Sequence, residues 1–426
     1  MENKSIKVAW ICHFSNKEFN QKLPLKVGGF YGFIYRLIKG NIATTEVSDF
    51  GVWNINAINE MTKFSDRIEL HVIAPYPHLN TQVHEYTEDG IYYHFFRPNY
   101  IFIEKIINHF PTIYDLYKPS YKKNRSIIKM LIENIQPSII HLVGAENPYY
   151  SLSGLDVPRD IKLIVQLQTL MSDQKFFANY PIDKSSYDYR VGVEKAVIKR
   201  ADYVGTGISD YRKIILEDID PDAKFLDLKL AVGENIRKIE TEKKYDFVYF
   251  ARSINKACDW AVASFIEASK RKPGISLLVI GAYTSEEKAS YEITLQEYGL
   301  LDKVTFTGEL QTHDDVLENV ATARVALLPV KIDFIPGTIR EASALGLPVV
   351  TSITDGTPLL NEKRNCALLS KGGDHVSMAD NMINVLDDSD LADELVQNSY
   401  LQLQEKYNNA KVICKWVETY EHIQNR

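Results

Sequence analysis

The stretch Asp333–Ser352, DFIPGTIREASALGLPVVTS, holds a loop, a helix and a buried strand in one short segment. Pro336 fits the first turn of a helix, where the N–H group that proline lacks would have no partner inside the helix. Gly346 suits the end of that helix, and Pro348 leads into the apolar run VVTS. A helix that leads directly into a buried strand is typical of parallel α/β sheets.

Short apolar runs rich in β-branched residues recur on both sides of this stretch. In the N-terminal half they are Ile6–Ile11, Ile68–Ile73, Ile139–Val143, Leu163–Leu167 and Tyr203–Thr206. In the C-terminal half they are Phe247–Phe250, Leu277–Ile280, Val304–Phe306, Val325–Leu328 and Val349–Thr351. The helical patterns between them include Asp49–Phe64, Tyr189–Arg200, Trp260–Arg271 and Asp314–Ala321. Nearly continuous hydrophobicity is typical of strands buried on both faces, so the alternation predicts right-handed βαβ units.

The alternation of strand-like runs and helical patterns starts near the N-terminus and starts again after the polar segment 233–244. We expect an α/β protein with two Rossmann-like doubly wound domains that face each other across a cleft. The predicted domains are residues 1–232 and 245–407, and the polar segment 233–244 is the predicted linker. Residues 408–426 are predicted to form a C-terminal helix that packs back on the N-terminal domain.

Composition excludes several classes of protein. The 426 residues carry a net charge of −7, which disfavours general binding to nucleic acid. The isolated cysteines Cys12, Cys258, Cys366 and Cys414 form no CxxC pair and predict neither a zinc cluster nor a disulfide framework. No signal peptide and no apolar stretch of about 18 residues is evident. We therefore expect a cytoplasmic protein in a reducing compartment.

The helix start within the opening stretch has the features of a phosphate site. Gly337 and Thr338 would present free N–H groups there, and the helix dipole favours an anion at that end. Asp333 precedes this start and Glu341 lies inside the helix. One carboxylate could meet a sugar hydroxyl and the other a ribose hydroxyl. The alternative to a ligand site is an ordinary capped helix on which the carboxylates of Asp333 and Glu341 are simply exposed to solvent.

Two cations follow the run Phe247–Phe250, in the sequence YFARSINKACDW. Arg252 and Lys256 would lie in the loop at the carboxyl end of that strand, where ligands of α/β sheets bind. Two positive charges there can neutralise a departing diphosphate. Alone, the pair would be ordinary surface cations. Their place in the same half as Asp333 and Glu341 favours a shared site.

Residues 245–375 resemble the donor half of retaining glycosyltransferases with the two-Rossmann B fold, most of all glycosyltransferase family four. The features that carry the resemblance are Arg252 and Lys256 after the strand, Gly308 after VTF, the pattern over Asp333–Val350, and the loop SITDGTPL at Ser352–Leu359. In the N-terminal half, QPSIIHL and EKAVIKRADYVGTGIS fit the family more weakly.

The resemblance implies a donor site that uses Gly308, Gly337, Thr338 and Glu341, with Arg252, Lys256 and Asp333 in catalytic roles and no metal or other cofactor. The family usually has glutamate at the position of Asp333, and many members have histidine where this chain has Gln168.

The N-terminal half should hold the acceptor. His13 follows the first strand, Glu146 follows the strand of HLVGA, and Gly28 with Gly29 precede a predicted helix. In the family such a Gly-Gly pair allows close approach of the backbone to substrate, although a lone histidine or a Gly-Gly pair is often only structural. The basic segment Lys118–Lys129 is either a solvated helix face or a contact with anionic lipid at the cytoplasmic face of the membrane.

These features predict a metal-independent retaining hexosyltransferase. It would move a sugar from a nucleoside-diphosphate sugar to a glycan or lipid-linked acceptor, in surface polysaccharide biosynthesis by family resemblance. One alternative is a sugar-nucleotide 2-epimerase, which would need more acid–base residues than His13 and Glu146. Another is a non-catalytic sugar-nucleotide-binding subunit, motivated by the departures at Asp333, Phe334 and Gln168. A nicotinamide dehydrogenase is disfavoured because no GxGxxG motif follows a first strand.

Overall fold

The computed structural model describes most of the chain. The described residues are 5–26, 50–99, 118–174, 183–233, 239–251, 257–281, 283–331, 335–354 and 356–425. The chain divides into two compact units, the first made of Met1–Ala231 with Asn409–Arg426 and the second of Val232–Asn408. Each unit is built around its own sheet.

Unit 1 contains an eight-stranded sheet with the order β3-β4-β2-β1-β5-β6-β7-β8. The strands are β1 (Ile6–Ile11), β2 (Ile68–Pro75), β3 (Val83–Glu88), β4 (Ile91–Phe96), β5 (Ile139–Val143), β6 (Lys162–Gln166), β7 (Tyr203–Gly205) and β8 (Phe225–Leu226). All neighbouring pairs are parallel except β3 with β4. The carboxyl ends of β1, β5 and β6 therefore lie side by side.

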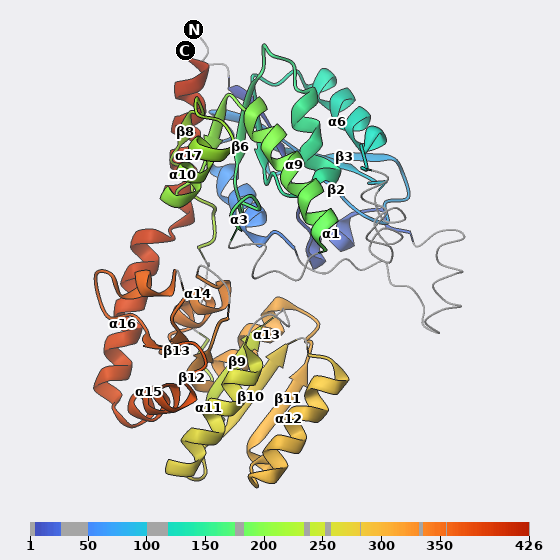
Figure 1. Cartoon of the computed structure of the whole chain (residues 1–426). Coiled ribbons are helices and arrows are strands. Elements are labelled where there is room, and N and C mark those ends of the chain that lie inside the picture. Colours follow the sequence, from blue (N-terminus) through green and yellow to red (C-terminus); the bar gives the residue numbers. More distant parts are fainter. Residues whose placement is uncertain are drawn as a thin grey trace. The chain divides into compact units, whose positions relative to one another are not determined.

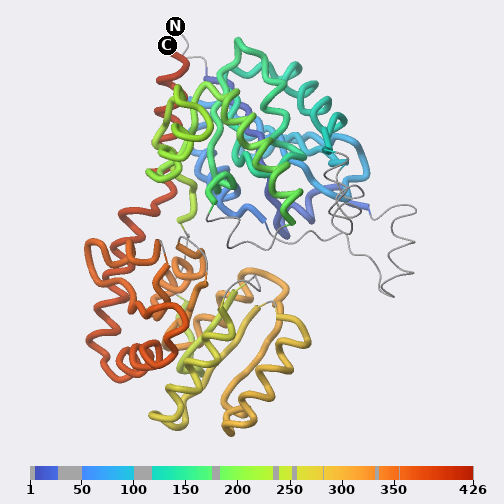
Figure 2. Tube along the Cα trace, in the orientation of Figure 1, coloured from blue at the N-terminus to red at the C-terminus, as the bar shows by residue number. Residues whose placement is uncertain are grey.

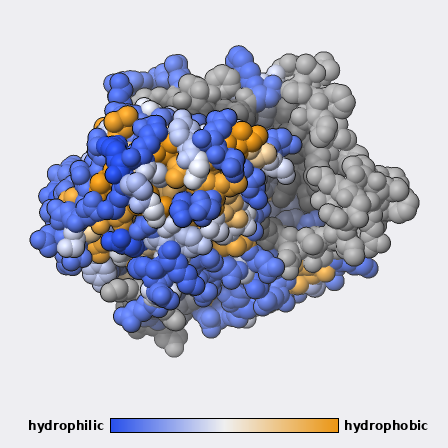
Figure 3. Space-filling model, turned by 90° about the horizontal axis from the view of Figure 1, so that it is seen from below, coloured by the Kyte–Doolittle hydropathy of each residue, from blue (hydrophilic) through white to orange (hydrophobic). Residues whose placement is uncertain are grey.

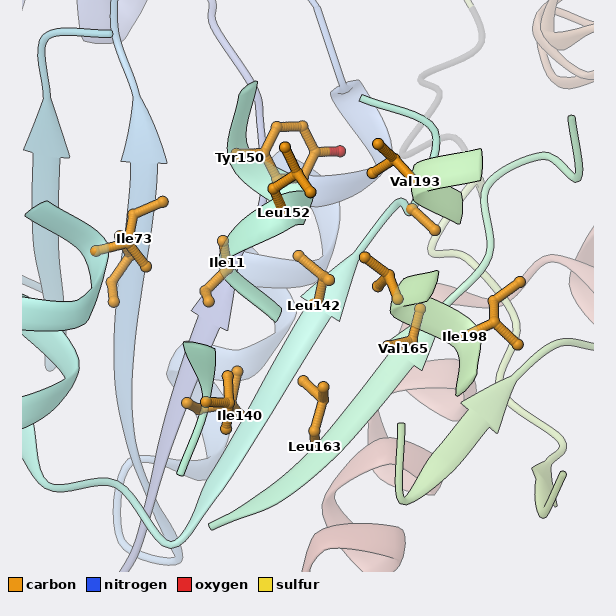
Figure 4. Close-up of a cluster of buried hydrophobic side chains, with 14 of the residues drawn as sticks. Ile11, Ile73, Ile140, Leu142, Tyr150, Leu152, Leu163, Val165, Val193 and Ile198 are labelled. Carbon is orange, nitrogen blue, oxygen red and sulfur yellow. The ribbon is translucent and has the colours of Figure 1, made fainter. Parts of the chain in front are cut away.

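Helices cover both faces of this sheet (Figure 1). They are α1 (Lys17–Lys22), α3 (Val52–Met61), η1 (Thr62–Phe64), α6 (Lys122–Ile135), α7 (Pro148–Ser151), η2 (Leu152–Asp156), α9 (Lys184–Arg200), α10 (Ser209–Asp218) and α17 (Asn409–Gln424). Ile11 and Leu142 pack with residues of α6 and α9 on one face (Figure 4). On the other face, Trp10 packs with residues of α3 and α17. This two-sided burial explains why the strands lack a polar face.

The antiparallel hairpin β3–β4 differs from the expected parallel arrangement. Asp89 and Gly90 join the two strands, with φ angles of 49° and 77°. A two-residue turn of this kind needs positive φ at both positions, which Asp-Gly tolerates well. The hairpin adds an antiparallel edge to an otherwise parallel sheet.

Unit 2 contains a six-stranded parallel sheet with the order β11-β10-β9-β12-β13-β14. Its strands are β9 (Tyr245–Ala251), β10 (Leu277–Gly281), β11 (Val304–Gly308), β12 (Ala323–Leu328), β13 (Val349–Ser352) and β14 (Leu368–Ser370). Numbered within the unit, the order is 3-2-1-4-5-6, the arrangement of dinucleotide-binding folds. In such a sheet the carboxyl ends beside the first and fourth strands, here β9 and β12, form the usual binding edge.

The helices of unit 2 also divide between two faces. They are α11 (Cys258–Arg271), α12 (Ser285–Glu297), η3 (Leu301–Lys303), α13 (His313–Ala321), α14 (Gly337–Ala344), η4 (Thr357–Asn361), α15 (His375–Asp387) and α16 (Ser389–Lys406). Residues of α11, α15 and α16 share one apolar cluster, and residues of α13 and α14 share the other. The starts of α13 and α14 thus belong to the same side of the sheet.

Two doubly wound α/β units confirm the predicted fold class. The C-terminal region continues through α16 in unit 2 and then α17 in unit 1, and Figure 2 shows this last segment returning beside the N-terminal part of the chain. The predicted linker 233–244 falls in unit 2, where Ile239 packs against the cluster of α13 and α14. In the view of Figure 3, apolar side chains are interspersed with hydrophilic ones.

Candidate functional site

Five of the predicted site residues lie outside the described residues: Arg252, Lys256, Asp333, Gly28 and Gly29. Their assigned roles rest on the sequence. The structure describes the other seven, four in unit 2 and three in unit 1.

The predicted phosphate-binding helix is α14, which follows β12. Pro336 is its N-cap, one position earlier than expected, and no side chain caps the helix. Gly337 and Thr338 are therefore its first two residues. The N–H groups at a helix start have no partner within the helix, and with the helix dipole they favour an anion. The end of α14 follows the prediction, because Gly346 has a φ of 74° and its N–H donates to Ser343 O at 3.1 Å.

Glu341 lies about one turn inside α14 and faces a residue that the sequence analysis missed. Its Oε1 is 3.7 Å from Nε2 of His313, the first residue of α13. The Glu341 side chain is 15% exposed and that of His313 is 29% exposed, so both are reachable from solvent. Thr312 and Asp315 form a capping box that fixes the start of α13, and with it the backbone position of His313.

Gly308 ends β11, next to the loop that leads into α13. Its φ of 73° lies in the left-handed region, which explains the glycine. Its N–H donates to the hydroxyl oxygen of Tyr283 at 2.5 Å. The predicted donor-site residues Gly308, Gly337, Thr338 and Glu341 thus lie at strand ends and helix starts of one sheet edge.

In unit 1, His13, Glu146 and Gln168 follow the adjacent strands β1, β5 and β6. When the Gln168 amide is oriented to match its neighbours, its nitrogen donates to Glu146 Oε1 at 3.1 Å and its oxygen accepts from the Trp53 indole N–H at 3.2 Å. Trp53, from α3, was not predicted, because nothing in the sequence shows that α3 reaches this edge. The structure thus brings Glu146 and Gln168 into direct contact.

His13 occupies the same edge. Its Nδ1 shares a hydrogen bond with the hydroxyl of Tyr149, and its ring centre is 4.7 Å from that of Phe50. Burial lowers the pKa of His13 to about 4, so the imidazole is neutral at pH 7. Neutral histidine can donate or accept a hydrogen bond there without adding charge.

Glu146 is a buried carboxyl group at this edge, and its pKa is strongly shifted. It is buried, and that burial raises its pKa to about 7. Asn147 Nδ2 donates to Oε1 at 3.0 Å, whereas Oε2 has no hydrogen-bond partner among the described residues. Arg190 holds the turn, donating to Glu146 O at 2.9 Å and to Asn147 Oδ1 at 3.2 Å. At neutral pH this carboxyl is divided between its acid and ionised forms.

The described residues contain no group of three or more His, Cys, Asp or Glu side chains placed to hold a metal ion. Their helices include none that is both long enough and apolar enough to cross a membrane.

The comparisons with known proteins agree with the fold. Residues 244–388 match the family model described as Glycosyl transferases group 1. Sucrose-phosphate synthase from Thermosynechococcus elongatus is similar over 99% of both chains, with 16% identity and a TM-score of 0.62. HepE of Anabaena in complex with UDP is similar over 98% of this chain and 100% of its own, with 12% identity and a TM-score of 0.61. The sequence has no significant match among curated proteins.

Residues 244–388 thus resemble the glycosyltransferase group 1 family, and the fold of the chain matches that of glycosyltransferases with the B fold. The predicted resemblance is confirmed at this level. The narrower assignment to family four stays a prediction.

Proposed function

We propose that this protein is a retaining glycosyltransferase that uses a nucleoside-diphosphate sugar. The observation that carries the proposal is the edge of unit 2, where the uncapped start of α14 is followed by Glu341 beside His313. A helix start supplies donors for the diphosphate, and a carboxylate one turn away is suited to ribose hydroxyl groups. The family match covers this edge.

The donor we propose is a UDP-sugar. HepE was determined with UDP and with UDP and glucose, and the similar pneumococcal O-GlcNAc transferase was determined with UDP and GlcNAc. Gly337 and Thr338 would bind the diphosphate, Glu341 the ribose, and the loop at Gly308 would lie beside the nucleotide. These roles follow from position at the sheet edge and from the family resemblance.

The residues outside the described part complete the proposal. Arg252 and Lys256 would stabilise the diphosphate as it leaves, so that no metal is required, and Asp333 would orient the hexose. Arg252→Ala and Lys256→Ala should lower turnover more than donor affinity, because the negative charge grows in the transition state. Wild-type turnover in both variants would contradict this role.

The acceptor half of the proposal assigns His13, Glu146 and Gln168 to acceptor binding. The acceptor would be a glycan or lipid-linked molecule of surface polysaccharide synthesis, handled in the cytoplasm. Gly28 and Gly29 would lie near substrate, and Lys118–Lys129 would be the segment nearest to anionic lipid if the protein works at the membrane.

Donor binding and donor chemistry test the proposal together. Thermal unfolding with UDP, GDP, ADP and CMP sugars should show stabilisation by UDP-sugars, about 2.7 kcal/mol at 100 times the dissociation constant. Without acceptor, NMR should show slow hydrolysis that first releases sugar of the donor's own anomeric configuration. Conversion to the 2-epimer would instead indicate an epimerase, and binding without any turnover on a glycan panel would indicate a non-catalytic subunit.

A further inference from the structure

Two buried histidines lie beside each other on one face of the first sheet. His71 of β2 and His94 of β4 are 7% and 9% exposed, and Nδ1 of His71 lies 2.9 Å from Nε2 of His94. The planes of their rings differ by 20°, and the ring centres are 5.2 Å apart. Because a hydrogen bond needs one donor and one acceptor, one of these two nitrogens carries a proton and the other does not.

Carboxylates lie at both ends of the histidine pair. Nε2 of His71 is 3.0 Å from Oε1 of Glu69, and Nδ1 of His94 is 2.5 Å from Oε1 of Glu85 on β3. Lys7 of β1 in turn pairs with Glu69 at 3.1 Å. The chain of contacts therefore crosses β1, β2, β4 and β3, which are neighbours in the sheet in this order.

The number of protons in this chain follows from the donor and acceptor roles. An ionised carboxylate only accepts, so the outer nitrogen of each ring must carry a proton. The bond between the two rings needs a third proton. Two neutral imidazoles carry two N–H protons in all, so the complete chain contains one imidazolium. Its charge and that of Lys7 balance the charges of the two carboxylates.

The extra proton belongs on His94. Burial lowers the pKa of His71, although the hydrogen bond with Glu69 acts in the opposite direction. The bond between His94 and Glu85 is the shortest of the three, and charge-assisted hydrogen bonds are shorter than neutral ones. His94 therefore donates to both Glu85 and His71, and His71 donates to Glu69.

The remaining described surroundings of the pair add little charge. Tyr92 of β4 stacks on the His71 ring, with 4.7 Å between ring centres. The residues of α6 that pack on this face of the sheet are apolar. The charged residues of α6 are directed elsewhere, since Lys122, Lys123, Lys129 and Glu133 are exposed and Arg125 pairs with Asp156.

We propose that His71 and His94 share one extra proton and form a pH-sensitive switch that holds the hairpin β3–β4 on the parallel part of the sheet. With one extra proton, all three hydrogen bonds are made. A second extra proton makes both facing nitrogens donors, so the bond between the rings is lost and two cations face each other. Loss of the extra proton leaves two N–H groups for three bonds.

The effect should fall on β3. Among the described strands β3 pairs only with β4, and its residues are only partly buried. Such a segment opens locally at low cost in free energy. The folded chain resists the second extra proton more than the unfolded chain does, so the hairpin should lose stability as the pH falls below about 6.5, the ordinary value for histidine.

The test uses the whole chain and first locates the ring protons by NMR. Long-range ¹H–¹⁵N spectra report the protonation of each imidazole nitrogen, and His71→Gln and His94→Gln assign the two rings. At pH 7 the wild type should show one N–H group on His71 and two on His94. In His94→Gln, His71 should take up a proton at a higher pH than in the wild type, because the facing cation is gone.

Hydrogen exchange, corrected for the intrinsic rate at each pH, then measures opening of the hairpin. Amide protection in β3 should fall at least fivefold between pH 7 and pH 5, whereas protection in β5 of the same sheet should not. His94→Gln should remove this pH dependence. His84→Gln is the matched control and should behave as the wild type, because alternation along β3 places His84 on the opposite face from Glu85.

Glu85→Gln keeps the test decisive if His94→Gln does not fold, because the Glu85 side chain is 56% exposed. It removes the charge that stabilises the imidazolium, so the loss of β3 protection should move to a lower pH. Two results would overturn the proposal. One is a single N–H group on each ring at pH 7, with neither titration changed by substitution of the other ring. The other is an equal fall in β3 protection in the wild type, His94→Gln and Glu85→Gln, which would assign the pH dependence to other groups.

Discussion

At the scale of single residues, burial decides the charge of the candidate groups more than ion pairing does. Burial is the leading cause of the shift for both His13 and Glu146, lowering the pKa of the first to about 4 and raising that of the second to about 7. Both shifts favour the neutral form. At pH 7 His13 is neutral and Glu146 is only partly ionised, so this edge carries little charge and is suited to an uncharged ligand such as a sugar.

The raised pKa of Glu146 makes stability depend on pH. Since its pKa rises on folding from 4.5 to about 7, ionisation is harder in the folded state, and stability is lost as pH increases between these values. We expect Glu146→Gln to be more stable than the wild type at pH 8, by up to about 3 kcal/mol, and to lose that advantage near pH 4. Urea unfolding of the variant and the wild type at both pH values measures this difference in the free energy of unfolding. An advantage that is the same at pH 4 and pH 8 would contradict the assignment.

Glu341 is the residue on which donor binding should depend most within the described part. Glu341→Gln keeps the size of the side chain and removes its charge, so the loss should come from the ribose hydrogen bond, about 1.5–3 kcal/mol. Calorimetry with the UDP-sugar measures it. Glu318→Gln, at an exposed position of α13, is the control and should bind as the wild type does. Equal affinity in both variants would remove Glu341 from the donor site.

At the scale of elements, all ten strand runs predicted from the sequence are strands in the structure. The apolar runs identify strands well because each is buried on both faces. The hairpin β3–β4 was missed, although Asp89-Gly90 between two strand-like runs is a recognisable hairpin signal. The pair His313–Glu341 could not be predicted, because their proximity depends on α13 and α14 sharing one face of the sheet.

The C-terminal helix α17 is held by a buried hydrogen-bond chain. Trp10 Nε1 donates to the Tyr420 hydroxyl oxygen at 3.0 Å, and the same hydroxyl is 2.5 Å from His141 Nδ1. Burial lowers the pKa of His141 to about 3, so the ring is neutral and Nδ1 can accept from Tyr420. The Tyr420 hydroxyl therefore links α17 to β1 through Trp10 and to β5 through His141.

Removing that hydroxyl should destabilise unit 1. Tyr420→Phe leaves two buried polar groups without their partner, so we expect a loss of about 1–3 kcal/mol in the free energy of unfolding. Urea unfolding followed by tryptophan fluorescence measures it, since Trp10 and Trp416 both lie in this cluster. Tyr400→Phe, at an exposed position of α16, should change nothing. A loss that is equal in both variants would show that the chain of hydrogen bonds contributes nothing.

At the scale of the whole molecule, the two units differ in how the chain builds them. Unit 2 is one continuous segment, Val232–Asn408, with its own two apolar clusters. Unit 1 needs two distant segments, because α17 contributes the buried residues Ile413, Trp416, Val417, Tyr420 and Ile423 to one of its clusters. The difference arises because α17 follows α16 in the chain but packs on the first sheet.

This difference predicts how each unit behaves alone. Residues 232–408 should unfold cooperatively as an isolated fragment and should keep the stabilisation by UDP, because the sheet, α13 and α14 are all within it. Residues 1–231 should lack a cooperative transition, since the absence of α17 exposes Trp10 and leaves its indole N–H without a partner. Joining residues 409–426 to 1–231 through a flexible Gly-Ser linker should restore the transition. Circular dichroism during thermal unfolding compares the three fragments. If residues 1–231 unfold at the same temperature with and without the added helix, α17 is dispensable to unit 1, and the hydrogen-bond chain through Tyr420 does not hold the first sheet together.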